Sequence, residues 1–141
     1  MKRILLLFLI LGATCAAHAQ DRAKWTSDML EAKHKMLVEE VGMTPTQQEQ
    51  FLPLYEAMEN EIFQTNRNAR TLAASVEKKK APADSDYLQA AEALSNAKMR
   101  EGEIEAKYFE KFAKILSKRQ LFLLKQAENK FTRTMLQKRK N

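Results

Sequence analysis

Cysteine, glycine and proline are all scarce in this sequence. Its 141 residues include one cysteine, three glycines and three prolines. A lone cysteine cannot form a disulfide within the chain, and a β fold needs many more turn-forming residues than these. No run of alternating β-branched residues predicts a strand, whereas apolar residues recur at steps of three and four over long windows. The sequence therefore predicts an all-α protein.

The patterns in which enzymes place their catalytic residues are also missing. There is no nucleophile elbow and no glycine-rich loop that could hold phosphates. Beyond the first nineteen residues the only histidine is His34, and it has no serine or cysteine partner at a readable spacing. We expect no enzyme activity, no catalytic residue and no cofactor, so any action on other proteins would be independent of ATP.

The first nineteen residues have the three parts of a secretory signal peptide. Lys2 and Arg3 precede an apolar run over residues 4–11, and small residues end the segment at Ala19. The apolar run is too short to span about 30 Å of hydrocarbon, and no second run follows, so we expect no stable membrane insertion. An alternative is a lipid anchor on Cys15, although the residues before it lack the usual lipidation pattern.

These features predict a signal peptide over residues 1–19 and one exported helical domain over residues 20–141. Loss of Lys2 and Arg3 with the signal would lower the net charge from +6 to +4. In an exported protein this surplus favours acidic protein segments or anionic membrane surfaces over nucleic acid as partners. A plain role in solubility is the alternative interpretation of the charge.

Four helices are expected after the signal. The first covers about residues 22–41 and ends at Gly42, which can adopt the left-handed conformation of a helix end. A charged segment over residues 78–83 separates the second helix from the third, and Asp84 or Ser85 is the expected cap of the third. The expected apolar stripes are Trp25, Met29, Ala32 and Met36 with Leu30, Leu37 and Val41 in the first helix; Phe51, Tyr55, Met58, Ile62, Thr65, Ala69, Leu72 and Val76 in the second; Tyr87, Ala91, Leu94, Ala97, Ile104, Tyr108, Phe112 and Ile115 in the third; and Leu121, Leu124, Ala127, Phe131 and Met135 in the fourth.

Pro53 falls inside the second helix. It removes one backbone donor and bends a helix at a cost of about 3 kcal/mol, which fits a curved protein. The alternative is that this helix begins only after Leu52.

Two similar segments open the second and the fourth helix. In the first, Thr44 can cap the backbone amide of Gln47 while Gln47 reaches back, with Met43 as the apolar residue ahead of the cap. In the second, Leu116, Ser117 and Gln120 repeat this arrangement. The pair resembles the LTxxQ motifs of the Spy/CpxP family of periplasmic chaperones and stress regulators, with Met43 in place of leucine and Ser117 in place of threonine.

The resemblance covers about residues 25–135 and implies both a fold and a function. The implied fold has four helices in two antiparallel hairpins, long and curved, which dimerise into a cradle. The implied function is a periplasmic, homodimeric chaperone or stress-response protein that binds unfolded or partly folded proteins and limits their aggregation. The two boxes themselves are expected to be helix caps rather than contacts to such clients.

Several apolar residues fall outside the main stripes, and a thin four-helix chain cannot bury all of them. They are expected either in a dimer interface or in a client-binding patch, together with neighbouring basic residues. The proposed set is Leu52, Phe63, Met99, Phe109, Phe122, Leu123, Arg67, Arg70, Lys107 and Lys111.

Three other functions stay open at this point. The chain could be the regulatory partner of an envelope stress sensor, as the regulator branch of the family would imply. It could be a metal sensor, although a zinc or nickel site needs three or four nitrogen or sulfur ligands and the expected mature chain offers only His34, so no metal site is predicted. A jaw-like chaperone of the Skp type would need strands, which the sequence does not predict.

Overall fold

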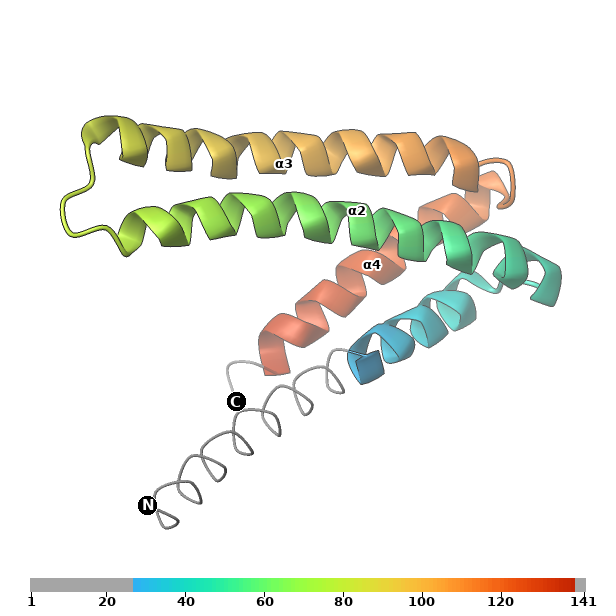
Figure 1. Ribbon diagram of the computed structural model, residues 1–141. Coiled ribbons are helices and arrows are strands. Elements are labelled where there is room, and N and C mark those ends of the chain that lie inside the picture. The colour runs from blue at the N-terminus through green and yellow to red at the C-terminus, as the bar shows by residue number, and fades with distance from the viewer. Residues whose placement is uncertain (1–26, 139–141) are drawn as a thin grey trace, which may run out of the picture. The chain divides into compact units, whose positions relative to one another are not determined.

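The structure is a computed structural model that describes residues 27–138. These residues are helical over 27–41 and then form α2 (Pro45–Glu77), α3 (Asp84–Phe112) and α4 (Lys118–Lys138), with no strand anywhere in this range. The expected all-α fold with four helices is confirmed (Figure 1). The expected signal peptide and Trp25 lie outside the described residues.

The start of α2 follows the sequence closely. Gly42 adopts a φ of 66° and ends the helix over residues 27–41, as predicted. Thr44 is the N-cap of α2, and Pro45 occupies the first turn, where its missing N–H has no helical partner to lose. α2 continues without interruption through Pro53 to Glu77, so the alternative start after Leu52 is wrong.

The cap of α3 differs from the prediction. Ala83 is the N-cap residue rather than Asp84 or Ser85, and its methyl side chain cannot accept a hydrogen bond. The carboxylate of Asp86 accepts from the Ala83 backbone N–H at 3.0 Å and from the Lys79 ammonium at 2.6 Å. A carboxylate in the first turn also interacts favourably with the helix dipole, so Asp86 supplies the stabilisation that a side-chain cap would have given.

α2 and α3 form an antiparallel hairpin within one compact unit, residues 42–123. At one end of the hairpin an aromatic cluster is buried, in which the rings of Phe51 and Phe112 are 4.8 Å apart and those of Phe51 and Tyr55 5.2 Å apart. Toward the loop over residues 78–83 the buried side chains are mostly small, namely Ala69, Ala90, Ala97 and Val76. The core of the hairpin therefore contains large aromatic side chains at one end and small side chains at the other.

The predicted stripe of α3 is partly wrong. Ala97, Ile104, Tyr108 and Phe112 are buried as expected, but Ala90 is buried in place of Ala91, and Tyr87 and Leu94 are exposed. α3 also ends at Phe112, before Ile115. The small side chains of Ala90 and Ala97 occupy the contact with α2, and Tyr87 and Leu94 lie beside this contact instead of in it.

The second compact unit pairs residues 27–41 with residues 124–138 of α4. Leu37 and Val41 are buried in the first segment, and Leu124 and Ala127 in the second, as their stripes predicted. Leu30 and Ala32, which belong to the predicted stripe of the first segment, are exposed. The two segments run antiparallel (Figure 1). Lys130 forms an ion pair with Glu40, and the ammonium of Lys33 lies 5.8 Å from the centre of the Phe131 ring.

None of the helices between residues 27 and 138 combines the length and the hydropathy that a membrane span requires.

Candidate functional site

The two capping boxes form as predicted, and they meet in space. Each glutamine accepts from the backbone N–H of its own cap residue, Gln47 from Thr44 at 3.1 Å and Gln120 from Ser117 at 2.9 Å. Each hydroxyl in turn accepts from the backbone N–H of its glutamine at 3.2 Å. Met43 and Leu116, the apolar residues ahead of the two caps, are both buried.

The two glutamine amides also bind each other. The Nε2 of each donates to the Oε1 of the other at 2.9 Å. The remaining N–H of Gln47 donates to the Ile115 carbonyl at 3.0 Å, and that of Gln120 to the Gly42 carbonyl at 3.2 Å. Each amide therefore uses both of its donors and both acceptor positions, and the two boxes are related by a local two-fold symmetry. We call these contacts the glutamine clasp.

The hairpin of α2 and α3 has two distinguishable sides. On one side the Asn66 amide donates to the Glu101 carboxylate at 3.3 Å. Phe63 and Arg70 are three and four residues from Asn66, and Leu94 and Tyr87 are one and two heptads before Glu101, so all four belong to this side. We call it the Phe63 side.

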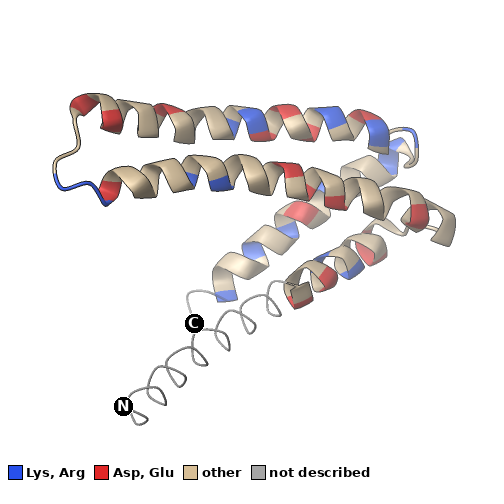
Figure 2. Cartoon of the chain, in the orientation of Figure 1, with Lys and Arg blue, Asp and Glu red and all other residues tan. Residues whose placement is uncertain are grey.

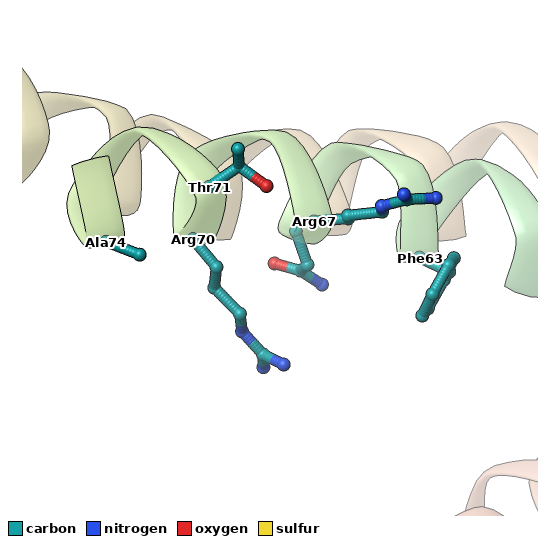
Figure 3. Close-up of a pocket in the computed structure, with 6 residues that line it drawn as sticks. Phe63, Arg67, Arg70, Thr71 and Ala74 are labelled. Carbon is teal, nitrogen blue, oxygen red and sulfur yellow. The ribbon is translucent and has the colours of Figure 1, made fainter. Parts of the chain in front are cut away.

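The Phe63 side carries exposed apolar groups with no cover from the described chain. Phe63 is 59% exposed, Tyr87 55% and Leu94 44%. Along α2 a shallow groove of about 260 Å³ is lined by Phe63, Asn66, Arg67, Arg70, Thr71 and Ala74. Figure 3 shows the Phe63 ring and the Arg70 side chain projecting from the same side of α2. Neither Arg67 nor Arg70 forms an ion pair with a carboxylate of residues 27–138.

On the opposite side of the hairpin an ion pair joins α2 and α3. The Lys107 ammonium donates to both oxygens of Glu61, at 2.6 and 2.7 Å, and lies 4.9 Å from the centre of the Tyr108 ring. The hydrogen bond from Lys107 holds the pKa of Glu61 below its usual value. A second groove on this side, lined by Thr65, Asn68, Ala69, Leu72, Ala93, Asn96, Ala97 and Arg100, contains no large exposed apolar side chain.

The structure brings together only part of the predicted client-binding set. Phe63, Arg67 and Arg70 line one groove. Phe109 lies about two turns beyond Glu101 on α3, and its side chain is 43% exposed. Met99 is exposed but two residues from Glu101, which places it roughly 200° away around the helix axis.

The other predicted positions lie elsewhere. Lys107 and Lys111 flank Tyr108, with the Lys111 ammonium 4.5 Å from the ring centre. Leu52 and Leu123 are half-buried, and Phe122, 62% exposed, belongs to α4.

Tyr87 and Leu94 are exposed residues of the Phe63 side, although helical periodicity predicts them in the core. Their spacing fits a helix stripe, so periodicity alone assigns them to the buried face. The signal that could have corrected this is the pair Ala90 and Ala97, which forms a second stripe of small residues seven apart.

Metal ligands do not gather in the described part of the chain. Residues 27–138 contain no group of three or more His, Cys, Asp or Glu side chains that could hold a metal ion. His34 is half-buried on the helix over residues 27–41 and has an interaction partner.

Comparison of this chain with protein-family models, with curated proteins and with solved structures finds no match.

Proposed function

We propose that the chain is an exported, periplasmic chaperone that binds unfolded or partly folded proteins without ATP and limits their aggregation. The observation that carries the proposal is the exposure of Phe63, Tyr87 and Leu94 on one side of the hairpin. Large apolar side chains exposed along one side of an otherwise charged protein provide a surface for contact with another chain. Covering the exposed apolar segments of an unfolded client would need neither catalysis nor a cofactor.

The arginines beside Phe63 support a binding role. Arg67 and Arg70 are exposed and unpaired among the described residues, so their charges are available to a partner. Electrostatic attraction between these guanidinium groups and acidic residues of a client raises the association rate. Apolar contact then lengthens the lifetime of the complex. A surface of this kind holds clients weakly and reversibly, because the groove is shallow and buries little of any one segment.

A homodimer is part of the proposal. Two copies would place two Phe63 sides in one assembly, and a long, curved, cradle-like dimer would present them together. Sedimentation velocity of the purified chain tests this directly, since the proposal requires a species of twice the monomer mass at micromolar concentration.

Light scattering from a chemically denatured protein, diluted into buffer with the purified residues 20–141 at stoichiometric ratio and without ATP, tests the chaperone activity. We expect the wild-type chain to reduce scattering and the triple variant Phe63→Ser, Tyr87→Ser, Leu94→Ser to lose most of this effect. Met99→Ser is the matched control, because it removes an equally exposed apolar side chain from another face of α3. Scattering that is unchanged by the wild-type chain would refute the proposal, and so would equal loss of activity in the control.

A further inference from the structure

α4 has a strongly unbalanced charge. Its 21 residues include six lysines and arginines and one acidic residue, Glu128. Figure 2 shows the basic positions distributed along the length of α4. A helix with this composition, when it also exposes apolar side chains, is typical of proteins that bind to membrane surfaces.

Four of the six basic residues share one face of α4 with two large apolar side chains. The buried face of the helix carries Leu121, Leu124 and Ala127. On the opposite face Phe122 is 62% exposed and Leu136 54% exposed, two heptads and about 21 Å apart. The other exposed residues close to this line are Lys118, Arg119, Lys125, Gln126, Asn129 and Arg133. We call this surface the outer face of α4, and it contains no acidic residue.

Most of the charge on the outer face is not neutralised by the protein itself. Lys125 pairs with Glu128 at 2.7 Å. Lys118, Arg119 and Arg133 form no ion pair with any carboxylate between residues 27 and 138. Lys118 and Arg119 also occupy the first turn of α4, where the helix dipole repels cations. Their positions therefore do not serve the stability of α4.

We propose that the outer face of α4 docks on an anionic phospholipid surface, with the helix lying in the plane of the interface. Lys118, Arg119, Lys125 and Arg133 would contact lipid phosphates, and Phe122 and Leu136 would enter the boundary between headgroups and acyl chains. A lipid surface fits better than an acidic peptide, because the outer face lines neither of the two grooves described above, whereas a flat array of phosphates can meet a convex helix along its whole length.

Co-sedimentation with lipid vesicles tests the proposal. The purified residues 20–141 are mixed with vesicles of phosphatidylcholine alone or with one third phosphatidylglycerol, at low and at high salt. We expect binding only to the anionic vesicles and its loss at high salt. Each basic residue near the surface contributes about fivefold to partitioning, so the pair Lys118→Gln and Arg133→Gln should weaken binding by roughly 25-fold. Phe122→Ser should weaken it by roughly tenfold.

The matched control is the pair Arg67→Gln and Arg70→Gln, which removes the same charge from α2. We expect it to bind vesicles as the wild-type chain does, while circular dichroism verifies that all variants stay helical. Equal binding to neutral vesicles, equal losses in the two pairs of variants, or binding to polyglutamate but not to vesicles would each overturn the proposal. The vesicle and aggregation assays are independent, so either function can fail without the other.

Discussion

Replacing Gln47 with alanine removes half of the glutamine clasp. The amide makes four hydrogen bonds, to the backbone N–H of Thr44, to the Ile115 carbonyl, and two to the Gln120 amide. A typical hydrogen bond contributes about 1 kcal/mol net. Because both glutamines are only half-buried and water can replace part of what is lost, we expect Gln47→Ala to lower the free energy of unfolding by about 2–3 kcal/mol.

The symmetry of the clasp makes the double variant the more informative experiment. Gln120→Ala should cost about as much as Gln47→Ala, since each amide makes the same kinds of contact. In the variant that carries both changes the two mutual hydrogen bonds are lost only once, so the effects should fall short of additive by about 1–2 kcal/mol. Urea unfolding followed by circular dichroism at 222 nm measures all of these values.

Thr44→Ala is the matched control for the clasp. It removes the cap hydroxyl but leaves the amide pair in place, and should cost about 1 kcal/mol. Additivity of Gln47→Ala and Gln120→Ala within about 0.5 kcal/mol, or a cost of either no greater than that of Thr44→Ala, would refute the reasoning that the two boxes stabilise each other.

Three further predictions use the same unfolding measurement. Phe112→Ala should destabilise the chain by about 3–5 kcal/mol, because it opens a cavity in the aromatic cluster, and a smaller loss would mean that the cluster collapses around it. Gly42→Ala should cost about 1 kcal/mol at its φ of 66°, whereas Gly102→Ala, in open space within α3, should stabilise the helix by about 0.5–1 kcal/mol; effects of the same sign would contradict this. The pKa values of Glu61 and Asp86 are lowered by hydrogen bonds from Lys107 and Lys79, so their stabilisation is present above about pH 4 and lost as the pH falls through the folded pKa values; a urea midpoint at pH 3 equal to that at pH 7 would exclude it.

The sequence was informative wherever a structure depends on neighbours in the chain. Thr44 with Gln47, and Ser117 with Gln120, were predicted as capping boxes because each needs only four consecutive residues. The mutual binding of Gln47 and Gln120 could not be predicted in this way. Each amide had a complete local role as a cap, and nothing in either segment specifies a partner more than 70 residues away.

The exposed surface was harder to predict than the core. Phe51, Tyr55 and Met58 are buried as their stripe predicted, because the apolar face of an amphipathic helix packs against the core. Tyr87 and Leu94 share that spacing but are exposed, since Ala90 and Ala97 are the buried residues of this part of α3. Which of two apolar stripes faces the partner helix depends on close packing across the hairpin, and one sequence does not contain that information.

The uneven width of the hairpin core implies graded local stability along α2 and α3. At one end Phe51, Tyr55 and Phe112 hold the helices together, whereas near the loop the contact rests on Ala69, Ala90 and Val76, which bury much less apolar area per turn. Backbone amides near the loop should therefore exchange with deuterium through local opening long before those near the aromatic cluster. The segment that carries Arg70 and Tyr87 can then fray and close again while the rest of the domain stays folded.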